Sequence, residues 1–269
     1  MRNVPFAKMA GAGNDFIVVD NRAKALKKPG AETARRLCDR KYSIGGDGLI
    51  LLEKSKKADI RMRIFNPDGS EAEMCGNGVR CIARFAADHK ITKSKLSIET
   101  LAGLITAEVR GDVVKAKLMD PRGLRTGLEV EVSGKNERVH FIDTGVPHAV
   151  LVVDSLAHCD VEGLGRAIRF HERFAPRGTN VDFISIRGKQ AVEVRTYERG
   201  VEDETLSCGT GSTAGALVAA ALEDLKSPVL VYTKGGETLK IYFTRKKEGF
   251  TGVYLEGKVQ TSFEGRVSL

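Results

Sequence analysis

The sequence contains no tryptophan, and aromatic residues make up only 6% of its 269 residues. A groove for single-stranded nucleic acid needs aromatic stacking partners beside clustered basic charge. The net charge of +8 therefore favours a basic solvated surface, because the Lys and Arg residues are spread along the chain. A non-catalytic, nucleic-acid-binding protein remains an alternative. Salt-sensitive binding of DNA or RNA that survives the loss of both Cys75 and Cys208 would support it.

Long apolar runs are also missing. No stretch approaches the roughly 20 apolar residues that span a bilayer. The first residues carry no apolar segment typical of a signal peptide. These absences predict a cytoplasmic protein without a membrane partner.

Cysteines are few, and their number is odd: Cys38, Cys75, Cys81, Cys159 and Cys208. They form no Cys-x-x-Cys pair and the five histidines are scattered, which argues against a disulfide framework and against a zinc site. We therefore expect free thiols. Cys38, Cys81 and Cys159 are expected to be packing residues.

Short strand patterns dominate the chain and are separated by Gly and charged pairs typical of hairpin turns. The predicted strands cover Phe16–Val19, Ile60–Ile64, Val113–Leu118, Ala149–Val153, Val181–Ile186, Val192–Thr196, Val229–Tyr232 and Leu239–Phe243.

Two predicted helices begin alike. Cys75 and Cys208 each open a Cys-Gly-x-Gly segment, and each segment runs into small or apolar residues. Val79, Ile82, Ala83 and Ala86 form an apolar stripe in the first helix, whereas the second is apolar nearly all round and must be enclosed.

The two cysteines lie about half the chain apart, which predicts a duplicated unit. We expect an α/β (α+β) fold of two pseudo-symmetric domains, residues 1–119 and 120–269. Each would be a curved, mostly antiparallel sheet or barrel around a central helix, with the active site in the cleft between them. The boundary is expected near Asp120, and the last residues, about 260–269, can pair back onto the first domain.

A cysteine at a helix start is chemically notable. A free thiol has a pKa of about 8.5, and the partial positive charge of a helix N-terminus lowers it. The same N–H groups can hold a carboxylate. Either cysteine alone could merely pack beneath a glycine turn, but the repeated context favours function. Two opposed thiols can invert a stereocentre, one as thiolate base and the other as thiol acid.

At this point the residues resemble a known family, diaminopimelate epimerase. The matching stretches follow in family order and cover nearly the whole chain: Lys8–Phe16, Phe65–Arg80, Thr144–His148, Gly178–Phe183, Tyr197–Gly200 and Cys208–Gly211.

The resemblance implies interconversion of LL- and meso-diaminopimelate in lysine and peptidoglycan precursor biosynthesis, with no cofactor and no metal. Cys75 would donate the proton and Cys208 accept it, and a homodimer is implied. His148 and Glu198 would adjust the pKa values of the thiols. The implied substrate contacts are Asn14, Asn66, Gly76, Asn77, Asn180, Glu198, Arg199, Gly209 and Thr210.

These residue types suit a substrate with an ammonium and a carboxylate at each end, since Asn both donates and accepts and Arg199 can grip a carboxylate. As turn residues, Asn14 and Asn66 also have a purely structural reading. Val146 stands where many members have Asn, and Gly48 where some have Gln. Both positions would touch the distal end of the substrate.

Two other enzyme classes remain open. A proline or hydroxyproline racemase of the same fold group binds a compact substrate and would not need Glu198 and Arg199 for a distal amino-acid end. A thiol redox protein would instead join Cys75 and Cys208 in a disulfide and exchange it with a partner.

Overall fold

The computed structural model describes residues 3–26 and 30–269, and its chain contacts divide into two units. Unit 1 runs to Lys117 and resumes at Gly257–Leu269, and unit 2 is Leu118–Glu256. The strand patterns read from the sequence all fall within observed strands or end within one residue of them. No helix in the described ranges is long and apolar enough to cross a membrane.

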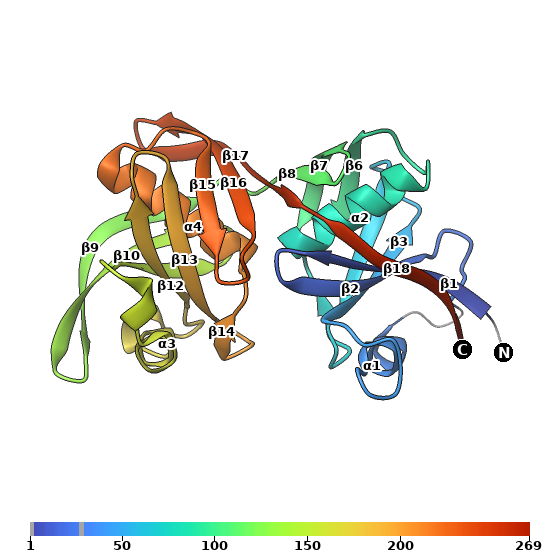
Figure 1. Cartoon of the computed structure of the whole chain (residues 1–269), viewed down its shortest axis with the longest axis horizontal. Coiled ribbons are helices and arrows are strands. Elements are labelled where there is room, and N and C mark those ends of the chain that lie inside the picture. Colours follow the sequence, from blue (N-terminus) through green and yellow to red (C-terminus); the bar gives the residue numbers. More distant parts are fainter. Residues whose placement is uncertain (1–2, 27–29) are drawn as a thin grey trace. The chain divides into compact units, whose positions relative to one another are not determined.

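Unit 1 is a curved sheet with two helices (Figure 1). β1–β2, β3–β4, β4–β5, β6–β7, β7–β8 and β1–β18 are antiparallel, whereas β2–β3 and β4–β6 are parallel. Parallel neighbours need a crossover connection, which α1 and α2 supply. Its elements are β1 (Asn3–Gly11), β2 (Asn14–Asp20), α1 (Ala31–Cys38), β3 (Gly48–Glu53), β4 (Ile60–Phe65), β5 (Glu71–Ala72), α2 (Gly76–Asp88), β6 (Lys95–Thr100), β7 (Gly103–Arg110), β8 (Val113–Lys117) and β18 (Gln260–Ser268).

Unit 2 repeats this arrangement. β9–β10, β10–β11, β12–β13, β13–β14, β15–β16 and β16–β17 are antiparallel, and the parallel pairs β11–β12 and β13–β15 are bridged by α3 and α4. Its elements are β9 (Arg122–Val132), β10 (Lys135–Asp143), β11 (Pro147–Val152), η1 (Leu156–His158), α3 (Val161–Arg169), η2 (Glu172–Phe174), β12 (Asn180–Arg187), β13 (Ala191–Glu198), β14 (Asp203–Thr205), α4 (Gly209–Glu223), β15 (Val229–Thr233), β16 (Thr238–Lys246) and β17 (Gly249–Lys258), whose last two residues belong to unit 1.

Every pairing named for unit 1 has a counterpart of the same sense in unit 2, so the two units share one topology. β1 to β8 correspond to β10 to β17, and β18 corresponds to β9. The registers then match single residues. Ile50 pairs with Ile64 in unit 1, where Asp182 pairs with Thr196 in unit 2. Cys75 and Cys208 follow β5 and β14 at the same distance and are equivalent.

The central helix of each unit explains why so many strand residues are buried. Val79, Ile82, Ala83 and Ala86 of α2 are all buried in the core of unit 1, as the apolar stripe predicts. In α4 every residue from Gly211 to Ala220 is buried, which confirms that this helix is enclosed. Each buried CH₂ contributes about 0.8 kcal/mol.

The sheet of unit 1 is covered on both faces near α2. Phe16 and Val18 of β2 face the α2 core, whereas Ile17 and Val19 pack with Leu37 of α1. A strand between two apolar layers needs a continuous apolar run, which β2 and β3 have. Cys38 and Cys81 are buried free thiols, Cys159 is a half-buried free thiol, and all three are outside the Cys-Gly-x-Gly segments.

Candidate active site

Cys75 is the residue directly before α2. Its backbone is extended (φ −141°, ψ 122°), and its carbonyl accepts the Val79 N–H at 2.8 Å, so the predicted helix start is confirmed. The side chain is half-buried and packs against the core of unit 1. As the first residue of α2, Gly76 places its N–H at the open start of the helix, where no intrahelical acceptor exists.

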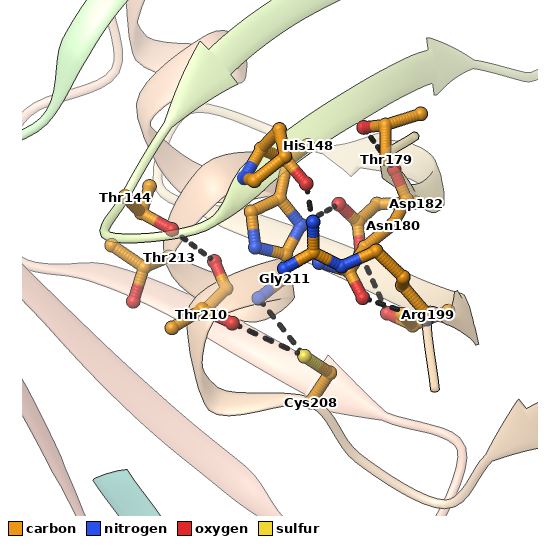
Figure 2. A network of polar contacts seen from close by, with 12 residues as sticks. Thr144, His148, Thr179, Asn180, Asp182, Arg199, Cys208, Thr210, Gly211 and Thr213 are labelled. Atoms are coloured by element: carbon orange, nitrogen blue, oxygen red, sulfur yellow. Dashed lines mark hydrogen bonds and ion pairs between the residues drawn. The ribbon is translucent and has the colours of Figure 1, made fainter. Parts of the chain in front are cut away.

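Cys208 occupies the equivalent place before α4, and Figure 2 shows its polar contacts. Its Sγ accepts the Gly211 N–H at 3.4 Å and lies 3.3 Å from Thr210 Oγ1. The residue is only 7% exposed. The carbonyl of Thr210 in turn accepts from Thr144 Oγ1 at 3.3 Å, which anchors the first turn of α4.

The expectation of a lowered thiol pKa is wrong for Cys208, because other effects outweigh that of the helix start. Burial raises the pKa of Cys208 well above its ordinary value, and the carboxylates of Glu198 and Asp182 raise it further. The hydrogen bonds from Thr210 and the Gly211 N–H lower it only in part. Cys208 is therefore a thiol at neutral pH here, and forming its thiolate requires a change in its surroundings.

Asn14 and Asn77 of unit 1 belong to one chain of hydrogen bonds. Arg80 Nη2 donates to Asn77 Oδ1 at 2.6 Å, Asn77 Nδ2 donates to Asn14 Oδ1 at 2.7 Å, and Asn14 Nδ2 donates to Asp47 Oδ2 at 3.2 Å. Because Arg80 can only donate and the Asp47 carboxylate accepts, the chain fixes both amide orientations. Within residues 3–26 and 30–269, these bonds leave Asn14 one side-chain N–H and one carbonyl lone pair.

Asn66 is exposed directly after β4. Its Nδ2 donates to Ser70 Oγ at 2.9 Å, and its backbone N–H donates to the Ser70 carbonyl at 2.8 Å. These bonds fit the structural reading of Asn66 as a turn residue. By the register, however, Asn66 is the equivalent of Glu198, which lies at the end of β13.

Asn180 joins the start of β11 to the residue after β13. It is 4% exposed, its Nδ2 donates to the Pro147 carbonyl at 3.1 Å, and its Oδ1 accepts the Arg199 N–H at 2.9 Å. The predicted residue pair Glu198 and Arg199 is thus held at the end of β13 by the start of β12. This structural duty explains why a buried Asn stands at a strand start.

Arg199 lies in a cationic neighbourhood. Burial lowers the pKa of its guanidinium, and the charges of Arg169 and Arg177 lower it further. Its Nη1 donates to the Arg177 carbonyl at 3.3 Å, and Arg169 is paired with Glu202 at 2.8 Å. The charges of Asp143 and Glu202 act in the opposite direction, and the net effect is a lowered pKa.

His148 is fully buried in β11 and bonded to a residue that the sequence analysis missed. Its Nδ1 lies 2.7 Å from Asp182 Oδ2, and Thr196 Oγ1 donates to Asp182 Oδ1 at 2.7 Å. The only signal in the sequence was that Asp182 interrupts an apolar run between Val181 and Phe183. In the structure both of these neighbours are buried. Arg80 and Asp47 were missed too: Arg80 ends the matching stretch Phe65–Arg80 but was not among the implied contacts, and Asp47 stands in no recognisable pattern.

The predicted residues gather in two sets, one in each unit. Cys75 and Cys208, Gly76 and Gly209, Asn77 and Thr210, and Asn66 and Glu198 stand at equivalent positions of the duplicated fold. The first set is Asn14, Asn66, Cys75, Gly76 and Asn77, and the second is His148, Asn180, Glu198, Arg199, Cys208, Gly209 and Thr210.

Solved structures with this fold include members of two other groups. A phenazine biosynthesis protein of the PhzF family from Bacillus anthracis matches with a TM-score of 0.77 at 18% identity, covering 100% of both chains. A probable proline racemase from Agrobacterium radiobacter matches with a TM-score of 0.72 at 16% identity, covering 99% of this chain and 93% of that one. At these identities the likeness defines the fold alone.

Sequence relatives are more specific. A family profile described as diaminopimelate epimerase matches residues 6–121 and 140–262. Diaminopimelate epimerases of Aquifex aeolicus and Archaeoglobus fulgidus are 45% and 42% identical, over 98% and 99% of this chain and 97% of each relative. These relatives place the chain among isomerases of the epimerase class. The chain belongs to the diaminopimelate epimerase family.

Proposed function

We propose that this chain interconverts LL- and meso-2,6-diaminopimelate, with Cys75 and Cys208 as the acid–base pair. The observation that carries the proposal is the equivalence of the two cysteines, each directly before the central helix of one unit. Inverting a carbon requires a proton acceptor on one face and a donor on the other, and a duplicated unit provides two such groups.

In the LL-to-meso direction Cys208 is the acceptor and Cys75 the donor. The Cys208 thiolate takes the proton from the α-carbon, leaving a carbanion whose charge spreads into the carboxylate. The Cys75 thiol then gives its proton to the opposite face. N–H groups at the starts of α2 and α4 stabilise the carboxylate charge, and the roles exchange in reverse.

His148 and Glu198 are proposed to adjust the thiols. The effect of the Glu198 charge on the pKa of Cys208 supports an interaction between these two groups. A nearby carboxylate favours the protonated thiol, so neutralising Glu198 or offsetting its charge with a substrate ammonium favours the thiolate.

The proposed substrate contacts combine neutral, cationic and acidic groups. Asn14, Asn66, Asn77 and Asn180 offer amide donors and acceptors, and Arg199 offers a bidentate partner for the distal carboxylate. The remaining contacts are Gly76, Glu198, Gly209 and Thr210. The guanidinium groups around Arg199 support its role with an anion.

We further propose that units 1 and 2 are the two epimerase halves and that the enzyme uses no cofactor. The proposed setting is the cytoplasm, as a homodimer in lysine and peptidoglycan precursor biosynthesis, without a nucleic-acid or membrane partner. These proposals rest on the family resemblance and on composition. The mass of the purified protein in solution tests the dimer.

The activity is tested with reduced protein and two substrates in parallel, LL-diaminopimelate and L-proline. The proposal expects meso-diaminopimelate to form and proline to stay unchanged. Turnover of proline alone would favour a racemase of the same fold. Thiol–disulfide exchange with a partner, without isomerisation of either amino acid, would favour a redox protein instead.

A further inference from the structure

The two central helices begin over different pairs of residues, although the fold beneath them is duplicated. Ile50 and Ile64 pair across β3 and β4, and Asp182 and Thr196 pair at the equivalent place across β12 and β13. We call these the floor pairs of unit 1 and unit 2. One floor is apolar, and the other carries a carboxylate and a hydroxyl.

Both floor pairs lie under the same point of the helix, the glycine three residues after the cysteine. A Cβ on Gly78 would lie 3.1 Å from Ile50 Cδ1 and 3.2 Å from Ile64 Cδ1. A Cβ on Gly211 would lie 2.2 Å from Asp182 Oδ1 and 3.0 Å from Thr196 Oγ1. The glycine contacts thus support the equivalence given by the strand register.

A third position differs in the same sense. Phe16 of β2 and His148 of β11 are equivalent, since they pair with the first residues of β3 and β12. Unit 1 therefore fills this region with Phe and two Ile side chains, whereas unit 2 fills it with His, Asp and Thr. Packing alone is satisfied by the apolar set, because the same topology is built on it in unit 1.

Burying the polar set costs folding free energy, so its presence indicates a use other than packing. The side chains of His148 and Asp182 are both fully buried, and taking a carboxylate out of water costs several kcal/mol even after relaxation. Asp182 recovers part of this through its bonds to Thr196 Oγ1 and His148 Nδ1, each at 2.7 Å. Its position beneath the first turn of α4 also favours a negative charge.

The bond to Asp182 decides which nitrogen of His148 carries the proton. A carboxylate accepts, so Nδ1 is the donor, and the neutral ring keeps its lone pair on Nε2. Nε2 is buried and has no hydrogen-bond partner within residues 3–26 and 30–269. Among the described residues it is therefore an open polar atom of this network, and it can accept a hydrogen bond.

We propose that Asp182 is a positioning residue that holds His148 in the Nδ1–H tautomer, so that Nε2 is presented as an acceptor in unit 2 alone. This inference rests on the proposed function, in which His148 acts on the thiols. It assigns to the duplicated fold an asymmetry between its halves: unit 2 carries a tautomer-fixed imidazole where unit 1 carries a phenyl ring.

The test uses Asp182→Asn with two readouts at neutral pH. The new amide can turn either way, because the Thr196 hydroxyl both donates and accepts, so His148 loses its fixed tautomer. In ¹⁵N-histidine-labelled wild type we expect a protonated Nδ1 and an unprotonated Nε2, assigned among five histidines with His148→Gln. D182N should show the other tautomer or a mixture.

The second readout is epimerase kinetics. We expect D182N to lower kcat by about 100-fold, the scale of a lost acid–base group, with KM changed by less than about threefold. A structural role would lower the unfolding temperature and leave both the tautomer and kcat per folded molecule unchanged. Ser185→Ala, which removes another buried hydroxyl of β12, is the control and should keep both.

If D182N does not fold, the double variant D182I/T196I is used instead. It gives unit 2 the two Ile residues that form the floor pair of unit 1, and the tautomer and kcat are measured in the same way. An unchanged tautomer, or a kcat within about threefold of wild type, in either folded variant would overturn the inference. Wild-type protein that lacks epimerase activity would instead overturn the proposed function, so the two failures are distinguishable.

Discussion

Asn77 donates through Nδ2 to Oδ1 of Asn14 at 2.7 Å, and this bond joins the start of α2 to the start of β2. Arg80 and Asp47 close the chain at its two ends. Two residues that the family resemblance marks as substrate contacts thus orient each other. Their free donor and acceptor atoms are set before any ligand arrives, which reduces the cost of ordering them on binding.

Changing Asn77 to Asp tests this orientation. The new carboxylate still accepts from Arg80 but cannot donate to Asn14, which is then free to turn. We expect KM for diaminopimelate to rise by about 10- to 100-fold with a smaller change in kcat, since one or two hydrogen bonds are lost. Steady-state kinetics measure this, and Asn136→Ala on the exposed part of β10 is the control. An unchanged KM would show that this chain of hydrogen bonds does not orient the substrate-binding residues.

Gly211 and Gly78 offer a matched pair for stability. In G211A the new Cβ would lie 2.2 Å from Asp182 Oδ1, which must move within a buried network. In G78A the nearest atoms are the Ile50 and Ile64 Cδ1 methyls, more than 3 Å away at the ends of flexible chains. We expect G211A to lower the free energy of unfolding by about 2–3 kcal/mol and G78A by about 1 kcal/mol. Denaturant titration measures both free energies of unfolding. Equal losses in the two variants would contradict the proposed difference between the two floor pairs.

The pKa of Asp15 predicts a pH-dependent part of the stability. Burial would raise this pKa, but hydrogen bonds from Arg40 and Lys8 outweigh it and hold it at about 2. A lowered carboxyl pKa stabilises the fold above about pH 4, and this contribution disappears as the pH falls toward 2.

We therefore expect Asp15→Asn to cost about 2 kcal/mol at pH 7, with about 1 kcal/mol of that difference gone by pH 2 after allowance for solvent screening. The part that remains reflects Lys8, which is 7% exposed and loses its carboxylate partner. Denaturant titration at several pH values checks this. Asp112→Asn, whose carboxylate is 3.6 Å from Lys258 Nζ, should show almost no difference at any pH.

Cys208 should be slow to alkylate at neutral pH. Because burial and the charges of Glu198 and Asp182 raise its pKa, its thiolate forms only at a pH well above that of an ordinary thiol. In Cys75→Ala protein, iodoacetamide labelling of Cys208 should begin to rise only at a pH above that at which an ordinary exposed thiol reacts. Glu198→Gln should move this rise to lower pH. Fast labelling of Cys208 at pH 7 in folded wild-type protein would contradict the raised pKa of this thiol.

Much of the fold follows from local sequence. The helix starts at Gly76 and Gly209 were predictable because Cys-Gly-x-Gly precedes an apolar periodic run, and the strands because their runs alternate or are continuously apolar. The less regular strand β9 was not recognised, and β18 was expected only as a segment, about residues 260–269, that can pair back onto the first domain. They owe their structure to pairing with β10 and β1, which is a tertiary contact.

The residues of the candidate site that belong to sequence motifs were predictable. The features that depend on burial, such as the role of Asp182 and the pKa of Cys208, were not. Spacing alone could not show that Asp182 lies beneath α4, because that depends on how β12 pairs with β13. The direction of the Cys208 pKa was also predicted wrongly. The helix start does donate to Sγ, but desolvation is larger, and burial cannot be read from a motif.

The central claim is that two thiols exchange protons with one α-carbon. The most direct measurement follows LL-diaminopimelate with reduced protein in deuterated water, for wild type, Cys75→Ala and Cys208→Ala. We expect wild type to form meso-diaminopimelate with one deuterium at the inverted α-carbon and each variant to form none. Meso product without deuterium, or epimerisation by either folded single variant, would contradict the account.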